Sequence, residues 1–391
     1  MKDFSFCIPT RFIVGRDSPA RVGEAIASCG GTRVLIVEDG GAYLEKLLET
    51  VRLSIADAGL VPLQMERKAV SPTLSYVTEG VRFCRENGVD FVLAVGGGTV
   101  MDSAKAIAFF CENEGDLTEY VLYRKASPKC MKTGSVVTLS GTGSEVSATA
   151  MIIDDRTGPG IKYPLFQDSI RFRFSVMDPS LTVSLPLRIT MAGAFDAVTH
   201  IMEHYFNGES GYDMQDRLCE AVMTSIMVNM RAVMENPGDY GTRAQLQMGS
   251  TLANSTLLGL GCDSDWAVHY MENPVTTMTH NPHGSTLAII APAWMRYCYN
   301  RDIAKAVNFA VRVMGVTPAA SDEETAVRGI DALEAFLAGV GLPVRLSQIG
   351  VGPESFADLA DRALQTAGSD AVGGVSRLTR DDVIRIYELA R

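Results

Sequence analysis

The chain has 391 residues, of which 47% are hydrophobic and 21% are charged, and its 46 acidic and 35 basic residues give a formal net charge of −11. This length is enough for about two domains with separate cores, and the composition excludes a largely disordered chain. The negative charge argues against a nucleic-acid or anionic-membrane partner, because both would require a basic surface.

We expect neither a signal peptide nor a transmembrane helix. The N-terminal MKDFSFCIPTRFIVG lacks the apolar run of a signal peptide. No segment approaches the roughly 20 apolar residues of a transmembrane helix. The eight cysteines include no CxxC pair, so we interpret most of them as small core residues in a reducing compartment. The sequence predicts a cytoplasmic protein.

The first half alternates between short apolar runs and helical spacing. Residues 34–37 form an apolar run that ends in Asp-Gly-Gly, and helical spacing follows over 42–59. A second run at 91–95 stops at three glycines before the helical segment 102–110, and a third covers 135–139. Strand, glycine turn and helix in this order predict βαβ units, and continuous apolar runs indicate strands covered on both faces.

The second half is predicted to be helical. The segment SLTVSLP, which ends at Pro186, has the character of a linker. Long amphipathic segments follow it, at 190–205, 214–234, 240–258, 304–314, 323–338, 353–365 and 380–391. We therefore expect an α/β domain over residues 1–182, with a Rossmann-like parallel sheet, and an all-α domain over 183–391.

Two glycine-rich loops are candidates for nucleotide binding. Gly96, Gly97, Gly98 and Thr99 lie between a strand and a helix, where a backbone can approach a phosphate closely. Taken alone, this turn is either a phosphate cradle or simply a tight turn. A second loop, with Thr138, Thr142 and Ser144, ends the third strand. Both loops should lie at the carboxyl edge of the sheet, and together they favour a nucleotide.

Asp39 follows the first apolar run, where a carboxylate can bind a ribose diol and repel a 2′-phosphate. It could instead begin an Asp-Gly turn or cap the next helix. Glu38 beside it is an equal candidate for the ribose contact.

The five histidines all lie between residues 200 and 283. Asp196 and His200 are four apart and would share one helix face, which suits two ligands of one metal; an isolated pair of this kind is more often a surface hydrogen bond. With His269 and His283 they would supply one carboxylate and three imidazoles, a set suited to Fe²⁺ or Zn²⁺. Spacing alone does not establish that the four converge.

The other two histidines have less specific interpretations. His204 lies one turn beyond His200 as a rival ligand or a helix contact. His280 is expected in a loop near His283.

At these residues the chain resembles the iron-containing (group III) alcohol dehydrogenase family, and within it the butanol dehydrogenase and aldehyde reductase branch. The resemblance runs nearly end to end and rests on long motifs. They are IVGR at 13–16, GGGTVMDSAKAIA at 96–108, TLSGTGSEVSATAMIIDD at 138–155, DPSLTVSLP with AGAFDAVTHIMEHYF, and the segment 265–297. The resemblance implies a dehydroquinate synthase-like architecture, with a dinucleotide-binding domain over residues 1–182 and a domain that binds metal and substrate over 183–391.

The resemblance also implies roles for individual residues. Asp196, His200, His269 and His283 would be the metal ligands, for Fe²⁺ or alternatively Zn²⁺. Cofactor contacts would come from the two loops and their surroundings, namely Gly96, Gly97, Gly98, Thr99, Asp102, Thr138, Thr142, Ser144 and Lys162. Asp39 occupies a position where NAD-preferring members carry aspartate and NADP-using aldehyde reductases tend to carry glycine, so NAD is expected and NADP is the alternative. Asn273 departs from the family, which commonly has a histidine there near the substrate.

The implied function is that of a metal-dependent, NAD(P)-linked alcohol dehydrogenase or aldehyde reductase for small primary alcohols and aldehydes. The metal would act as a Lewis acid on the alcohol or carbonyl oxygen, and the nicotinamide would carry the hydride. The expected assembly is a homodimer or larger homo-oligomer. The alternatives are a glycerol-type polyol dehydrogenase, dehydroquinate synthase, and a nucleotide-binding protein without turnover.

Overall fold

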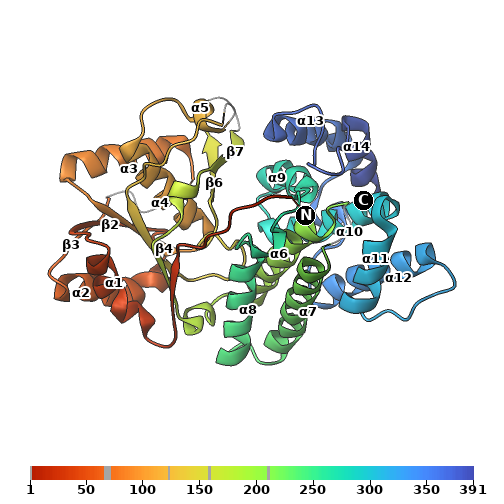
Figure 1. Ribbon diagram of the computed structural model, residues 1–391, viewed down its shortest axis with the longest axis horizontal. Coiled ribbons are helices and arrows are strands. Elements are labelled where there is room, and N and C mark those ends of the chain that lie inside the picture. Colours follow the sequence, from red (N-terminus) through yellow and green to blue (C-terminus); the bar gives the residue numbers. More distant parts are fainter. Residues whose placement is uncertain (1, 66–71, 122–123, 157–159, 209–211) are drawn as a thin grey trace. The chain divides into compact units, whose positions relative to one another are not determined.

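The computed structural model describes residues 2–65, 72–121, 124–156, 160–208 and 212–391. These residues divide into two compact units. One is Cys7–Ser184, and the other combines Leu185–Arg391 with the N-terminal residues up to Phe6. Figure 1 shows the first unit in red to yellow and most of the second in green to blue.

The first unit is built on a six-stranded parallel sheet with the order β1-β8-β5-β4-β2-β3. Its strands are β1 (Arg11–Val14), β2 (Arg33–Glu38), β3 (Val61–Leu63), β4 (Phe91–Gly96), β5 (Lys132–Val137) and β8 (Phe174–Met177). The predicted parallel sheet is confirmed. An antiparallel hairpin of β6 (Thr149–Asp154) and β7 (Ile161–Phe166), which the apolar runs did not indicate, follows the second glycine-rich loop.

Helices cover both faces of this sheet. They are α1 (Val22–Ser28), α2 (Glu45–Asp57), α3 (Leu74–Asn87) and α4 (Gly98–Glu112), while the short α5 (Leu117–Val121) packs with β7 of the hairpin. Because side chains alternate along a strand, Val34 and Ile36 of β2 pack with α1 and α2, whereas Leu35 and Val37 pack with α3 and α4. Burial on both faces explains why the central strands are continuously apolar.

The third strand differs from its predicted bounds of 135–139. It begins at Lys132 and ends at Val137, so the following loop starts earlier than the apolar run suggested. The run misses the strand's first half because Lys132 and Thr133 pair with Phe91 and Val92 although they are polar. A Cβ on Gly134, the next residue, would overlap the ring of Phe174 on the neighbouring strand β8.

The second unit is helical, as predicted. Its helices are α6 (Leu187–Tyr205), α7 (Asp213–Glu235), α8 (Tyr240–Ala253), α9 (Ala267–Thr279), α10 (His283–Cys298), α11 (Ile303–Asn308), α12 (Asp322–Gly339), α13 (Phe356–Ala367) and α14 (Arg380–Leu389). From residue 185 onward the described chain contains no sheet, only an isolated bridge between Val372 and Leu378. The core of this unit is formed largely by α6, α7, α9 and α10.

Two predicted helices of this unit differ most from their expected bounds. The segment 240–258 is helical only to Ala253, beyond which the chain makes a short 3₁₀ turn at Leu257–Gly259. The segment 304–314 divides into α11 and a π-helical turn, Phe309–Val313.

Two absences bear on the sequence analysis. Within the described ranges, no helix combines the length and apolarity needed to cross a membrane. None of the eight cysteines, all of which the structure describes, takes part in a disulfide.

Candidate functional site

The two glycine-rich loops meet at the carboxyl ends of β4 and β5. Since these strands are parallel neighbours, the residues after Gly96 and Val137 emerge at the same edge. The Thr138 amide donates to the Gly96 carbonyl at 3.2 Å. A Cβ on Gly98 would lie 2.7 Å from Thr142 Cγ2, so this approach of the two loops requires glycine.

The start of α4 faces this junction. Gly97 precedes the helix, Gly98 and Thr99 begin it, and no side chain of the described residues caps its first turn. The amide groups of a first helical turn have no partners within the helix, and the helix dipole makes that end positive. The arrangement suits a phosphate group.

A buried lysine anchors the second loop. The Lys105 ammonium is fully buried and donates to the carbonyl oxygens of Ser144, Ser147 and Thr149 at 2.6, 3.0 and 3.0 Å. Its burial lowers its pKa to about 8, and nearby carboxylates oppose that shift. A single ammonium group, that of Lys105 on α4, therefore fixes the backbone of the second loop.

Asp102 and Ser144, both expected to contact the cofactor, bind each other. The Ser144 hydroxyl donates to Asp102 Oδ1 at 2.8 Å, and the Met151 amide donates to Asp102 Oδ2 at 3.0 Å. Burial raises the pKa of Asp102, and the charges of Lys105 and Lys162 oppose this. Lys162 lies on β7, opposite Ile153 on β6. Asp102 and Ser144 are thus engaged within the protein and shape the loop.

The two acidic residues at the end of β2 have different surroundings. Glu38 is buried and accepts hydrogen bonds from the Gly40 amide and the Gln64 side chain. Asp39 is partly exposed; its carboxylate accepts from the Gly41 amide at 2.9 Å and from the Tyr43 hydroxyl. The Asp-Gly turn, which was the alternative prediction for Asp39, is therefore present. Of the two carboxylates, that of Asp39 is the more accessible to solvent.

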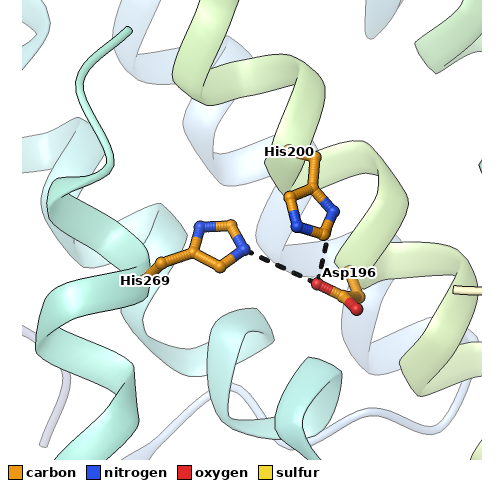
Figure 2. A group of neighbouring side chains, drawn as sticks. All are labelled: Asp196, His200 and His269. Atoms are coloured by element: carbon orange, nitrogen blue, oxygen red, sulfur yellow. Dashed lines mark ion pairs between the residues drawn. The ribbon is translucent and has the colours of Figure 1, made fainter. Parts of the chain in front are cut away.

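In the helical unit, Asp196 and His200 lie one turn apart on α6, and both are buried. His200 Nδ1 lies 3.5 Å from Asp196 Oδ1. Figure 2 shows His269 reaching the same oxygen from the neighbouring α9. His269 Nε2 is 3.6 Å away from it, and His283 Nε2, at the first residue of α10, is also 3.6 Å away. The structure therefore brings together the four residues that the sequence could not show to converge.

The donor atoms in this cluster suit a cation. Among the described residues, Asp196 Oδ1, His200 Nδ1 and His269 Nε2 are buried and have no hydrogen-bond partner. Their separations of 3.5–3.6 Å are longer than good hydrogen bonds. These three residues each offer one ligand atom, all within 4.8 Å of one another. One carboxylate oxygen and three imidazole nitrogens form a donor set that fits Zn²⁺ or Fe²⁺.

The surroundings act differently on the members of this donor set. Burial opposes ionisation of Asp196, but His200 and His283 hold its pKa below the usual range. Burial lowers the pKa of His200 to about 3, which keeps this imidazole neutral with its lone pair available. Burial would also lower the pKa of His269, but the neighbouring carboxylates of Asp196 and Glu203 raise it to about 9, so a bound cation would have to displace a proton from this ring.

Trp266 closes one side of the cluster. Its ring centroid lies 5.8 Å from that of His200 and 5.3 Å from that of His269. Its backbone φ of 64° is unusual for a non-glycine residue. His204 packs edge-on against the same indole at 5.5 Å, and its Nδ1 lies 2.6 Å from the Ser264 hydroxyl. His204 is thus a neighbour that positions Trp266, and the structure gives it no contact with Asp196.

Comparison with known proteins identifies the family. The sequence profile described as "Iron-containing alcohol dehydrogenase" matches residues 9–179, and that of the "Fe-containing alcohol dehydrogenase family, C-terminal" matches residues 190–391. The chain belongs to the iron-containing alcohol dehydrogenase family. It is an oxidoreductase of this family's alcohol dehydrogenase and aldehyde reductase type.

Full-length relatives agree with this assignment. The chain is 32% identical to NADH-dependent butanol dehydrogenase A of Clostridium acetobutylicum, with 99% of each chain covered. It is 30% identical to the NADPH-dependent aldehyde reductase YqhD of Escherichia coli, with 100% of each covered. The crystal structure of NADH-dependent butanol dehydrogenase A from Thermotoga maritima superposes with a TM-score of 0.93 at 32% identity, covering 100% of this chain and 99% of that one.

Two buried glutamates in this iron-containing alcohol dehydrogenase were missed by the sequence analysis. Glu203 Oε1 lies 3.0 Å from His269 Nδ1, and Glu272 Oε2 lies 2.5 Å from His283 Nδ1. A signal for both was available, because each glutamate follows a candidate ligand by three residues, in His200-Ile-Met-Glu203 and His269-Tyr-Met-Glu272.

The remaining histidine and the departure from the family pattern also have defined places. His280 is exposed and ends α9 with a φ of 55°. Asn273 is buried on α9, one turn after His269, and the next residue, Pro274, lies inside the same helix.

Proposed function

We propose that the chain is a metal-dependent alcohol dehydrogenase or aldehyde reductase that interconverts small primary alcohols and aldehydes with NAD(H). The observation that carries the proposal is the convergence of three imidazole nitrogens on one buried oxygen of Asp196. Relatives named as NADH-dependent butanol dehydrogenases support the substrate class and the cofactor, and the NADPH-dependent aldehyde reductase keeps NADP(H) as the alternative.

We assign the metal to Asp196, His200, His269 and His283, with Fe²⁺ as the expected ion and Zn²⁺ as the alternative. A divalent ion at these residues would supply Lewis acidity toward the alcohol or carbonyl oxygen, which favours hydride transfer to or from the nicotinamide. The chain's own contribution is geometric. His200 is kept neutral by burial, and the indole of Trp266 shields one side of the ligand rings from water.

We assign the cofactor to the carboxyl edge of the parallel sheet. The pyrophosphate would lie against Gly97, Gly98 and Thr99 at the start of α4, where unpaired amides face it. Gly96, Thr138 and Thr142 shape the junction of the two loops, and Lys162 would supply a positive charge beside it. Asp39 would bind the ribose diol of NAD.

Asp102 and Ser144 act in this proposal through the loop. Their mutual hydrogen bond and the contacts of Lys105 hold the second loop against α4. They are positioning residues for the cofactor.

One experiment tests the proposal against its rivals. Protein purified without chelator is analysed for metal, and NADH oxidation is then measured with butyraldehyde, with glycerol and NAD⁺ as a second assay. We expect about one metal per chain and turnover of the aldehyde. Glycerol oxidation without aldehyde reduction would indicate a polyol dehydrogenase, and NADH binding without any turnover would indicate a nucleotide-binding protein. Light scattering of the same sample tests the expected homodimer or larger homo-oligomer.

A further inference from the structure

Two of the candidate ligands are each followed, three residues later on the same helix, by a glutamate. Glu203 lies three residues after His200 on α6, and Glu272 lies three residues after His269 on α9. Neither glutamate makes its ion pair with the histidine that precedes it. Glu203 contacts His269, and Glu272 contacts His283. Each glutamate thus lies on the same helix as one candidate ligand and contacts the candidate ligand that comes next in the sequence.

The contacts fix the direction in which two imidazoles point. Glu203 lies beside Nδ1 of His269 and Glu272 beside Nδ1 of His283. In both rings the opposite nitrogen, Nε2, faces Asp196 Oδ1 at 3.6 Å. The contact of Glu203 with His269 is a hydrogen bond, whereas Glu272 and His283 form a close ion pair whose two facing atoms make no hydrogen bond. A hydrogen on Nδ1 of each ring suits the facing carboxylate, and that tautomer leaves the lone pair of Nε2 available to a cation beside Asp196.

The glutamates are themselves held in place. Glu203 Oε1 also accepts from the His269 backbone amide at 3.2 Å, in the first turn of α9. Glu272 accepts from the Thr276 hydroxyl, which lies 3.1 Å from the Thr286 hydroxyl on α10. The two carboxylates therefore tie α6 to α9 and α9 to α10 at the residues that carry His269 and His283.

Their burial is costly unless a positive charge compensates it. The side chain of Glu203 is 1% exposed and that of Glu272 is 0% exposed. Among the described residues, neither forms an ion pair with a lysine or arginine. Two carboxylates that are buried without such partners and aimed at imidazoles gain most when those imidazoles bind a cation.

We propose that Glu203 and Glu272 are positioning residues of the metal centre, which hold His269 and His283 in the tautomer and orientation required for metal binding. His200 differs, because it presents Nδ1 to Asp196 and no carboxylate of the described residues forms an ion pair with its other nitrogen. The inference rests on the proposed metal centre and extends it to residues that do not touch the ion.

The test measures the affinity for Co²⁺ and Zn²⁺ alone, by competition with a chelator, in Glu203→Gln, Glu203→Ala, Glu272→Gln and Glu272→Ala. We expect each glutamine variant to bind either ion about 10-fold more weakly and each alanine variant up to about 100-fold more weakly, since glutamine retains an acceptor for Nδ1–H but loses the charge. The visible spectrum of bound Co²⁺ should also change, because a rotated imidazole alters the ligand field.

A matched control separates positioning from simple packing. Glu220 is a buried glutamate of the same unit that accepts from the Tyr205 hydroxyl and pairs with Arg312. Glu220→Gln should lower the unfolding temperature and leave the metal affinity and the Co²⁺ spectrum unchanged. The same result in the Glu203 and Glu272 variants would overturn the inference.

Asp196→Ala distinguishes this failure from failure of the proposed function. If the wild-type chain binds Co²⁺ and Zn²⁺ no more tightly than Asp196→Ala, the metal centre itself is wrong. If the wild-type chain binds tightly and all four glutamate variants match it, only the positioning role is wrong.

Discussion

Each unit of the molecule buries charged groups, and one centre in each unit neutralises its charges in a different way. Lys105, in the first unit, is surrounded by carbonyl and hydroxyl oxygens of one loop, with Asp102 among the charges nearby. In the helical unit, Asp196, Glu203 and Glu272 are buried among imidazoles, and several of the polar atoms that face one another lack a hydrogen bond.

The comparison distinguishes a buried charge with a structural role, that of Lys105, from buried charges with a functional role in the helical unit. Burying a charge is tolerated when the chain supplies its partners, as at Lys105. Unpaired buried donors and acceptors call for an explanation such as a bound ion, and for the donor set of the helical unit we expect a divalent cation. The two centres should therefore respond differently to substitution.

The largest expected effect comes from removing a ligand. His269→Ala or His283→Ala should abolish tight metal binding. It should lower kcat/KM for aldehyde reduction by more than the roughly 100-fold that is typical when a residue hydrogen-bonded to a metal ligand is replaced. Metal analysis of the purified variants and kcat/KM for butyraldehyde measure both effects. Affinity for NADH should be retained, because the two cofactor loops and their lysine anchor all belong to the first unit. A variant that keeps a full complement of tightly bound metal would show that the ligand set is wrong.

Removing Lys105, which anchors the second loop, should weaken NADH binding and leave metal binding intact. Lys105→Met leaves three loop carbonyls without their donor, and we expect it to cost about 3 kcal/mol of stability. We also expect NADH affinity to fall about 10-fold, equivalent to 1.4 kcal/mol, while metal content is retained. Denaturant unfolding and NADH titration measure these changes.

Lys305→Met is the matched control for Lys105. Lys305 is likewise buried, but it lies in the helical unit, where it donates to the Tyr205 carbonyl, Asn207 and Asp216. Its loss should destabilise the protein and leave NADH affinity unchanged. Equal NADH affinities in the two variants would refute the anchoring role of Lys105.

The sequence predicted the elements that follow simple periodicity. Strands β2 and β4 are continuous apolar runs ended by glycines, and α6 and α7 are long and regular, so local pattern and final structure coincide. Helices α9 and α10, which carry His269 and His283, were not predicted. Each contains a proline, Pro274 or Pro292, which normally interrupts a helix.

The sequence predicted which residues form the candidate metal site, but it did not predict how they are arranged in space. The spacing of Asp196 and His200 places them on one helix face. The return of His269 and His283 to the same oxygen depends on how three helices pack, which residue spacing does not encode. Glu203 and Glu272 stood in a repeated His-x-Met-Glu pattern, but their partners lie on other helices, so a search within one helix would have paired them with the wrong histidines.

A smaller effect is expected at the cofactor's ribose. Asp39 would gain two hydrogen bonds from a ribose diol and repel a 2′-phosphate, by about 4 kcal/mol per unit charge at 4 Å and an effective dielectric near 20 before screening. Even a quarter of that is several-fold in affinity. We predict a preference for NADH over NADPH, measured as the ratio of kcat/KM values with one aldehyde, that Asp39→Gly narrows or reverses.

Tyr43→Phe is the control for Asp39, because it removes the hydroxyl that donates to this carboxylate and keeps the charge. The preference for NADH should persist in this variant. Equal kcat/KM values for the two cofactors in the wild-type chain would show that Asp39 is not the selector.

The smallest effect is spectroscopic and requires no turnover. Trp266 lies within 6 Å of the His200 and His269 rings, whereas the other tryptophan, Trp294, packs against Phe206 on the helical core. In Trp294→Phe the remaining fluorescence comes from Trp266 alone. Co²⁺ should quench it partially and saturably, and Zn²⁺, a closed-shell ion, should quench it far less. In Trp266→Phe the Co²⁺ affinity measured by chelator competition should persist while the quenching disappears. Saturable quenching that survives Trp266→Phe would place the bound ion away from Asp196 and its histidines, and the contrast between the two buried centres would then lose its basis.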